Sequence, residues 1–461
     1  SLLTLPCSDD IYLNNRQKGL QTTRLRPVER TRKFRTIDGK FESLKKRNFL
    51  TIDDFKIKGK VLLLRVDVNS SINPETGQIL DDTRIKRHSK TVEELSELEA
   101  RTVILSHQSR PGKQDFVNLE KHAERMSEII SKKIKFIPDV CGELAVKSIK
   151  SMKDGEIIML DNVRFDEQEI SLRKFNGKDF APQARAKMVE VLAPLASLFV
   201  NDAFAAAHRC QPSLVGFAEK LPTVAGRVMQ RELDYLGKAI DSGPTPRIAL
   251  LGGSKAADSV TIANNFLEKG VSEVLTGGVV ANIFLIASGV DIGKPSTEFI
   301  IQHISEYEEV IDSARKLIDN YGERIVLPTD VAINENGLRR GISIEELPTE
   351  HAVYDIGLDT LVSYIEKIEK AGTIISNGPM GVFENPEFAA GTRETFSAMA
   401  NSKGITVVGG GETTMAFNQM GLSSKIEHLS TGGGSCISFM SGETMPALEA
   451  MRRSKIRYES K

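Results

Sequence analysis

Short runs of aliphatic and β-branched residues alternate with longer amphipathic stretches from about residue 48 onward. Helical spacing of apolar residues, as in 119–130, predicts helices between the runs. Strands that alternate with helices in this way predict an α/β protein built on parallel sheets. The runs expected to be strands are 61–64, 102–105, 135–137, 157–160 and 198–200 in the first half, and 248–251, 273–275, 325–327, 373–375 and 405–408 in the second.

The length of 461 residues exceeds what a single hydrophobic core usually supports. We therefore expect two doubly wound, Rossmann-like domains, 48–228 and 229–439, with the segment from about 440 to 461 returning to the first. Residues 227–240 have helical periodicity, contain a single glycine and precede a Ser-Gly-Pro breaker, which predicts a connecting helix with a hinge.

Composition narrows the classes of function. Hydrophobic residues make up 40% and charged residues 27%, and no apolar run approaches the ~20 residues of a membrane helix. The net charge of −1, from 61 basic and 62 acidic residues, does not favour a nucleic-acid or membrane partner. Four widely spaced cysteines indicate neither a zinc site nor a disulfide framework. A reducing, cytoplasmic location is the natural interpretation.

Residues 1–47 differ from the rest, with 12 Lys and Arg against 5 Asp and Glu. Such a segment is compatible with a basic arm, an organelle-targeting peptide or an unstructured leader. Its scattered acidic residues are atypical of a transit peptide, and it has little apolar periodicity. We therefore interpret it as a disordered leader.

Polar and cationic residues follow the predicted strands of the first half. Ligands of open parallel sheets bind beyond the carboxyl ends of the strands. Guanidinium groups match carboxylate and phosphate oxygens two at a time, so several of them predict a site for a small, multiply charged anion. Arg65 adjoins its strand and is equally compatible with a structural role. The residues that suggest the anion site are Arg84, His107, Arg110, Arg164 and Arg209.

Glycines take these positions in the second half. Bare backbone at strand ends lets phosphates approach N–H donors and helix N-termini, so five such loops predict a polyphosphate or nucleotide surface. Lys255 lies on the first loop. An anion site together with a phosphate surface favours phosphoryl transfer. The loops are Gly252-Gly253, Gly277-Gly278, 377–381, 409–411 and 432–434.

The common nucleotide motifs are missing from the sequence. There is no P-loop, no G-x-G-x-x-G at the first β-α turn of either half, and neither H-R-D nor D-F-G. These absences argue against a P-loop enzyme, a dinucleotide dehydrogenase and a protein kinase.

Nine short motifs occur in this order along the chain: RVDVN, DDTRI, SHQSRPG, DNVRF, NDAFAAAHR, LGGSK, NGPMGVFE, GGGETT and STGGGS. Together they resemble the motifs of the phosphoglycerate kinase family, and their residues are closer to those of its archaeal branch. The resemblance extends from about residue 48 to 450. It implies reversible phosphoryl transfer between ATP and 3-phosphoglycerate, by hinge closure of two domains, in glycolysis and gluconeogenesis. It also implies Mg²⁺, with ATP or ADP as co-substrate.

The resemblance assigns site residues. Lys255 and Arg84 are expected to be catalytic, Glu384 to bind the ribose and Glu412 to bind the metal. The expected substrate-binding residues are Asp67, Val68, Asn69, Arg84, His107, Gln108, Ser109, Arg110, Arg164 and Arg209. The expected nucleotide-binding residues are Gly253, Lys255, Gly278, Asn377, Pro379, Glu384, Gly410, Gly411, Glu412 and Thr413.

Two positions depart from the family pattern. Ser259 stands where many members carry a second lysine, and Glu412 stands where they carry an aspartate. A catalytically weak relative that acts as a binding protein therefore stays an alternative, as does a dinucleotide-dependent oxidoreductase. We expect small-molecule partners only, and a monomer or a simple homodimer.

Overall fold

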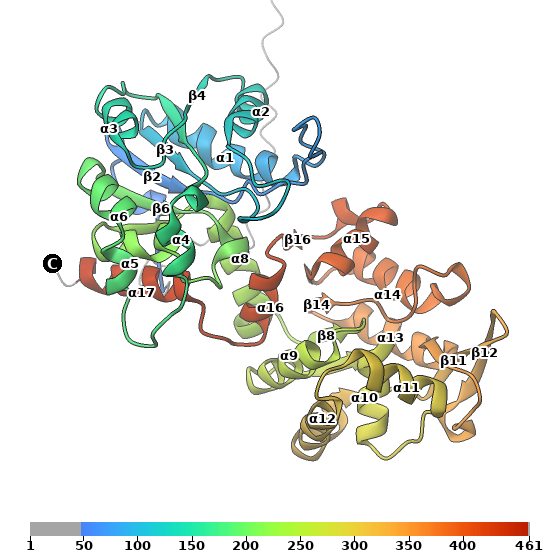
Figure 1. Cartoon of the computed structure of the whole chain (residues 1–461). Helices are drawn as coiled ribbons and strands as arrows, with labels where there is room; N and C mark the ends of the chain where they lie inside the picture. The colour runs from blue at the N-terminus through green and yellow to red at the C-terminus, as the bar shows by residue number, and fades with distance from the viewer. Residues whose placement is uncertain (1–47, 460–461) are drawn as a thin grey trace, which may run out of the picture. The chain divides into compact units, whose positions relative to one another are not determined.

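The computed structural model describes residues 48–459, and the leader predicted at 1–47 lies outside the described residues. Figure 1 shows two β-sheets, one in each half of the described chain, each with helices packed beside it. All ten strands expected from the sequence are present. The prediction of two parallel-sheet α/β domains is therefore confirmed, whereas the exact boundary near 228 stays a prediction.

The first sheet has seven strands in the order β1-β7-β6-β2-β3-β5-β4, and every neighbouring pair is parallel. Two of its strands, the edge strand β1 and its neighbour β7, are short elements that the sequence pattern did not predict. The strands are β1 Leu50–Thr51, β2 Val61–Arg65, β3 Arg101–Leu105, β4 Ile134–Ile137, β5 Ile157–Leu160, β6 Leu198–Asn201 and β7 Thr223–Ala225.

Alternation along β2 divides the core of this half into two layers. Leu62 and Leu64 pack on the face that carries α1 and α2, whereas Leu63 packs on the opposite face with α3 and α6. Successive strand residues point to opposite faces, so a parallel strand covered on both sides must be apolar throughout. The helices of this half are α1 Thr83–Glu97, α2 Glu120–Ile130, α3 Glu143–Lys150, α4 Glu167–Ser171, α5 Ala181–Ala184, α6 Lys187–Leu192, α7 Pro212–Val215 and α8 Arg227–Gly237.

The second sheet has six parallel strands in the order β10-β9-β8-β14-β15-β16. Leu250 of β8 packs with Tyr364 of α13, Phe396 of α14 and Phe417 of α15 in one core cluster. The strands are β8 Arg247–Leu251, β9 Glu273–Thr276, β10 Ile325–Val326, β14 Thr373–Asn377, β15 Ile405–Gly409 and β16 His428–Leu429. The helices are α9 Ala256–Glu268, α10 Gly278–Ala287, α11 Lys294–His303, α12 Tyr307–Tyr321, α13 Leu358–Lys370, α14 Ala390–Asn401, α15 Gly411–Gln419, α16 Gly434–Met440 and α17 Pro446–Glu459.

A small antiparallel sheet interrupts the second half between β10 and α13. Its order is β12-β11-β13, with β11 at Asp330–Glu335, β12 at Leu338–Ser343 and β13 at Val353–Ile356. The sequence analysis missed it because β12 is largely polar and exposed, so it lacks the apolar run of a buried strand.

Two segments connect the sheets. The first is α8, which continues as a π-helix over Lys238–Ser242, in agreement with the connecting helix predicted at 227–240. The second runs from β16 to α16 and leads to α17, whose Ser454 Oγ accepts a hydrogen bond from the backbone N–H of Thr223 at 2.9 Å. Helix α17 therefore packs on the first half.

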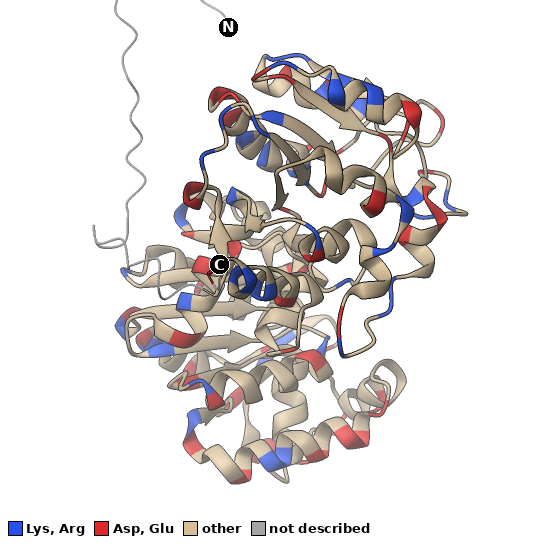
Figure 2. Cartoon of the chain, turned by 90° about the vertical axis from the view of Figure 1, so that its left-hand side faces the viewer, with Lys and Arg blue, Asp and Glu red and all other residues tan. Residues whose placement is uncertain are grey.

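Figure 2 shows Lys and Arg interspersed with Asp and Glu over the described chain. Within residues 48–459, no helix is both long and apolar enough to cross a bilayer. The three cysteines of this part of the chain, Cys141, Cys210 and Cys436, are buried free thiols.

Candidate active site

Four neighbouring strands of the first sheet, β6, β2, β3 and β5, carry the predicted anion-binding residues in the loops after their carboxyl ends. Because parallel strands end at one edge of a sheet, residues far apart in the sequence converge here. We call this edge, with its loops and the start of α1, the acid edge. The residues predicted for it are Asp67, Val68, Asn69, Arg84, His107, Gln108, Ser109, Arg110, Arg164 and Arg209.

Asp67 holds Arg84 at the acid edge. Its Oδ1 accepts hydrogen bonds from Arg84 Nη1 and from the backbone N–H of Asn69, both at 3.0 Å. Burial opposes ionisation of Asp67, but the positive charges of the neighbouring Arg84 and Arg65 lower its pKa well below the usual range. Asp67 is therefore an ionised carboxylate that orients the first turn of α1. The Arg84 side chain keeps 37% of its surface exposed.

The loop after β3 is tied to its neighbours by hydrogen bonds. Ser109 has a left-handed backbone with φ of 54°, and its N–H donates to Asn69 Oδ1 at 2.7 Å. The Ser109 carbonyl accepts from Arg164 Nη1. Three predicted site residues from three different loops are thereby in direct contact.

Val68 and Gln108 lie beneath this contact. The Val68 side chain is buried, and its backbone N–H donates to Ser106 Oγ at 3.1 Å. Gln108 is fully buried, and its side chain bonds both the N–H and the carbonyl of Ser70 at 2.9 Å. These contacts support the loops from below the surface.

The guanidinium groups of Arg164 and Arg209 are close enough for their positive charges to repel each other. Burial and the repulsion of Arg209 and Arg65 lower the pKa of Arg164 to about 10. The Arg164 Nε is buried without a hydrogen-bond partner in the described part of the chain. Uncompensated positive charge and an unused donor are what a bound anion relieves.

Two other cations behave differently. Arg65 is fully buried and donates to Ser213 Oγ at 2.9 Å. These contacts support a structural role for Arg65. Arg110 is exposed, and its guanidinium makes no hydrogen bond or ion pair with any described residue. No hydrogen bond or ion pair therefore ties the Arg110 side chain to the other predicted residues within residues 48–459.

The glycine loops follow five consecutive strands of the second sheet, in the order β9, β8, β14, β15 and β16. We call this edge the glycine edge. The residues predicted for it are Gly253, Lys255, Gly278, Asn377, Pro379, Glu384, Gly410, Gly411, Glu412 and Thr413.

Three of these loops pack backbone against backbone. The N–H of Gly253 donates to the Pro379 carbonyl, and the N–H of Gly278 donates to the Met380 carbonyl, both at 2.7 Å. Gly378 has φ of +94°, and a Cβ placed on it would lie 2.0 Å from the Gly252 carbonyl oxygen. Only glycine fits there, because any side chain would overlap the neighbouring loop.

The loop after β15 joins the same cluster. A Cβ on Gly410, which has φ of +86°, would lie 2.5 Å from Asn377 Oδ1. Thr413 Oγ1 accepts from the N–H of Gly378 at 2.6 Å. Gly411 and Glu412 are exposed in the first turn of α15. The predicted residues of three loops therefore converge at a helix N-terminus.

Lys255 immediately precedes α9 and is exposed, and its ammonium forms no hydrogen bond or ion pair within residues 48–459. Ser259, one turn later, is 1% exposed, and its Oγ has no partner among the described residues. The side chain at the position of the missing second lysine, Ser259, therefore lies on the buried side of α9. Glu384 is exposed beyond β14, and its carboxylate makes no described contact.

The sequence analysis missed several residues near these edges. Leu358, at the start of α13, is 62% exposed, and Val382, in the loop after β14, is 37% exposed. Glu169 and Ser213 are buried below the acid edge. No motif marked either pair, because exposure and burial of single residues are tertiary properties.

A metal site is less developed. The described residues contain no group of three or more His, Cys, Asp or Glu that could hold an ion. Mg²⁺ commonly uses one or two carboxylates and completes its shell with phosphate oxygens and water. The exposed Glu412, in the first turn of α15, offers one such carboxylate.

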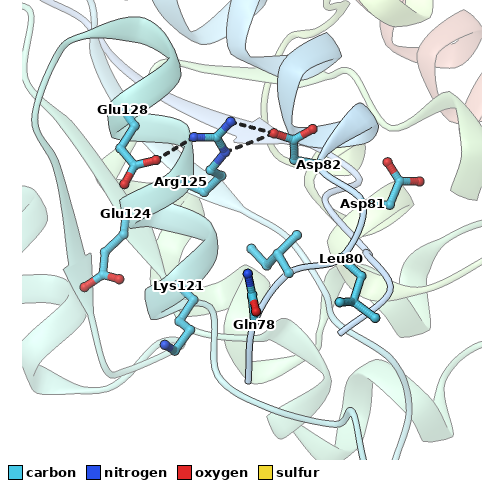
Figure 3. Close-up of a pocket in the computed structure, with 9 residues that line it drawn as sticks. Gln78, Leu80, Asp81, Asp82, Lys121, Glu124, Arg125 and Glu128 are labelled. Atoms are coloured by element: carbon cyan, nitrogen blue, oxygen red, sulfur yellow. Dashed lines mark hydrogen bonds and ion pairs between the residues drawn. The ribbon is translucent and has the colours of Figure 1, made fainter. Parts of the chain in front are cut away.

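One hollow lies between the loop that precedes α1 and helix α2. It has a volume of about 540 Å³ and is lined by 78–82 and by side chains of α2 (Figure 3). Its arginine, Arg125, is paired with Asp82 at 2.8 Å and with Glu128 at 2.6 Å. Because this cation is already compensated, the hollow is a poor anion site.

An arginine-rich edge on one parallel sheet and a glycine-rich edge on another define the class of small-molecule kinases that use two α/β domains. Comparisons with known proteins identify the family. The model of the family described as phosphoglycerate kinase matches residues 52–443. The chain belongs to the phosphoglycerate kinase family.

Relatives cover most of the chain. The phosphoglycerate kinase of Methanothermus fervidus is 45% identical over 410 residues, which is 89% of this chain and 98% of the relative. That of Thermoplasma acidophilum is 42% identical over 412 residues, 89% of this chain and 99% of the relative. The crystal structure of phosphoglycerate kinase from Pyrococcus horikoshii is 36% identical with a TM-score of 0.75, and the match covers 88% of this chain and all of that one. The predicted resemblance to the archaeal branch is confirmed.

Proposed function

We propose that the acid edge binds 3-phosphoglycerate, that the glycine edge binds ATP or ADP, and that the protein transfers a phosphoryl group reversibly between them. The observation that carries this proposal is the pair of edges, one with converging arginines and one with bare backbone. Each edge suits one of the two anionic substrates.

At the acid edge, the proposed ligand carries a carboxylate and a phosphate. Arg164 and Arg209 supply guanidinium forks, and Arg84 is held ready by Asp67. The unpaired Nε of Arg164 supports the proposal, because an anion oxygen would satisfy it. Asn69, Ser109, His107 and the flanking residues then shape the loops around the acid.

At the glycine edge, the nucleotide phosphates lie against the loops of Gly253, Gly278 and Gly410 in this proposal. The N-termini of α10 and α15 begin there, and helix N-termini favour phosphate. The remaining predicted roles are carried over: Glu384 binds the ribose, and Glu412 contributes a carboxylate to Mg²⁺. The metal neutralises phosphate charge when bound.

In the forward direction, a carboxylate oxygen of 3-phosphoglycerate attacks the γ-phosphorus of ATP. A new P–O bond forms while the bond to the β,γ-bridging oxygen breaks, and ADP leaves with that electron pair. Lys255 contacts the equatorial oxygens of the group in transfer, and Arg84 meets them from the acid edge. Both roles are electrostatic, since such transfers need positioning and charge compensation.

Transfer requires the two substrates to meet, so we propose that α8 and the segment from β16 to α16 act as a hinge. Hydrogen bonds link the two connecting segments to each other. Buried Glu232 of α8 accepts from His428 Nε2 at 2.8 Å and from the Thr431 N–H at 3.0 Å. We further propose a cytoplasmic monomer or simple homodimer with small-molecule partners only.

A steady-state assay with 3-phosphoglycerate, Mg²⁺ and either ATP or GTP tests the function directly. We expect ADP and 1,3-bisphosphoglycerate, measured by coupling to a dehydrogenase. Omission of Mg²⁺ should abolish turnover. Substrate binding without turnover would favour the alternative of a catalytically silent binding protein. Nicotinamide-dependent oxidation in the absence of ATP would favour an oxidoreductase.

A further inference from the structure

Four buried side chains form a continuous hydrogen-bonded chain beneath the acid edge. Glu169 Oε1 accepts from Ser213 Oγ at 2.6 Å, and Glu169 Oε2 accepts from the Ser213 backbone N–H at 2.9 Å. Ser213 Oγ accepts from Arg65 Nε at 2.9 Å. Arg65 Nη2 lies 3.1 Å from His107 Nδ1. The exposed fraction of these residues is 0–2%.

This chain decides which nitrogen of His107 carries the proton. A guanidinium has only donors, so Nδ1 of His107 must accept from Arg65. Burial and three neighbouring arginines lower the pKa of His107 well below its ordinary value, although Asp67 acts in the opposite direction. The ring is therefore neutral, and a neutral ring with a lone pair on Nδ1 has its proton on Nε2.

The Nε2–H is a donor without a hydrogen-bond partner among residues 48–459. His107 directly follows Ser106 at the end of β3, within the electrostatic reach of Arg164 and Arg209. An anion held by these arginines is the acceptor that this donor suits.

Glu169 anchors one end of the hydrogen-bonded chain, because both of its carboxyl oxygens accept from Ser213. Arg65 is fully buried, so its donors need acceptors within the protein. Burial raises the pKa of Glu169 to about 7, against the opposing effects of Arg65, Ser213 and Arg164. The carboxyl group of Glu169 is the last acceptor of the hydrogen-bonded chain. It acts on Arg65 through the hydroxyl of Ser213, which donates to Glu169 and accepts from Arg65.

We propose that Glu169 is a positioning residue of the acid site. Acting through Ser213 and Arg65, it fixes the Nε2–H tautomer of His107, which then donates to an oxygen of the bound acid. This inference rests on the proposed function, because the acid is taken to be 3-phosphoglycerate. The tautomer itself is a property of the free protein.

The test compares Glu169→Gln and Ser213→Ala with the wild type. Glu190→Gln is the matched control, since Glu190 is an exposed glutamate of α6 in the same half of the chain. Protein labelled with ¹⁵N-histidine gives the tautomer of each ring from long-range ¹H–¹⁵N correlations. The His107→Gln spectrum identifies the signals of residue 107 among the seven histidines.

We expect the Nε2–H tautomer for His107 in the wild type and in Glu190→Gln, and a mixture of tautomers in the other two variants. KM for 3-phosphoglycerate should rise about tenfold in those two variants, the effect of one weakened hydrogen bond to a charged group. KM for ATP should not change. Ser213→Ala removes only one hydroxyl, so it decides the matter if Glu169→Gln does not fold.

An unmixed Nε2–H tautomer in both variants would overturn the proposal. It would also be overturned if KM for both substrates rose together, because that indicates general loss of structure. Failure of the proposed function has a different signature, in which the wild type does not turn over 3-phosphoglycerate whatever the tautomer of His107.

Discussion

Replacement of Lys255 by alanine should reduce turnover far more than binding. The side chain is exposed, and its ammonium makes no hydrogen bond or ion pair with any other described residue. Its removal should therefore change the free energy of unfolding by no more than about 0.5 kcal/mol, as for other isolated surface residues. Any large effect of Lys255→Ala must then come from the reaction.

The size of that effect follows from electrostatics. An ammonium about 4 Å from a unit negative charge is attracted by about 4 kcal/mol when the effective dielectric constant is about 20. Loss of a single preorganised contact to a developing charge typically costs about 10²–10³ in turnover, or about 2.7–4 kcal/mol. The two estimates agree, so we expect kcat to fall by about that factor.

The assay is steady-state kinetics together with equilibrium binding of each substrate. Dissociation constants for 3-phosphoglycerate and ATP should change only a few-fold. Lys403→Ala is the matched control, because Lys403 is an exposed lysine just before β15, at the amino-terminal end of the same sheet. A near-normal kcat with strongly weakened ATP binding would refute the reasoning and make Lys255 a ground-state ligand of the nucleotide.

Three further predictions concern the two edges and their support. Arg164→Met should weaken 3-phosphoglycerate binding about 10- to 100-fold by calorimetry and leave ATP binding unchanged, since it removes a charged donor; equal weakening of both ligands would contradict its place at the acid edge. Gly378→Ala should lower Tm and weaken ATP binding, because its Cβ would overlap the Gly252 carbonyl, whereas Gly421→Ala, also at positive φ but with open space around it, should cost only backbone strain of about 1–3 kcal/mol. The pKa of Glu169 rises from 4.5 to about 7 on folding. At a pH between these two values, Glu169 is therefore protonated in the folded state and ionised in the unfolded state. Stability should therefore fall by roughly 3 kcal/mol as the pH rises from 4.5 to above 7, and denaturant titrations of Glu169→Gln should lack this contribution; identical pH profiles would contradict it.

Much of the fold could be read from local pattern. Each of the ten apolar runs became a strand, because a strand buried on both faces needs a continuous apolar segment. The short strands β1, β7 and β16 escaped detection, since two or three residues form no pattern. The sheet of β11 to β13 escaped because its strand β12 is largely polar and exposed.

The candidate site could be predicted as two groups of residues, but not as a set of contacts. Loops that follow neighbouring parallel strands must share an edge, and this alone brings Asn69, Ser109 and Arg164 together. The same reasoning treated Arg110 like the other arginines, although the structure leaves it exposed and without a partner in the described chain. The order of the strands determines which loops share an edge of the sheet. The direction of each side chain determines which residues in those loops contact one another.

By itself, the sequence determined the α/β class, ten strands of the two parallel sheets and the residue types of each edge, because periodicity and loop composition are local properties. Only the tertiary structure decided which polar residues are buried. Glu169 and Ser213 are 44 positions apart, and Ser213 and Arg65 are 148 positions apart, yet they share one hydrogen-bonded chain. Ser259 likewise points into the packing of α9, which no local pattern indicates. Burial depends on elements that meet only after folding, and burial is what sets the charge, the tautomer and the partner of each group.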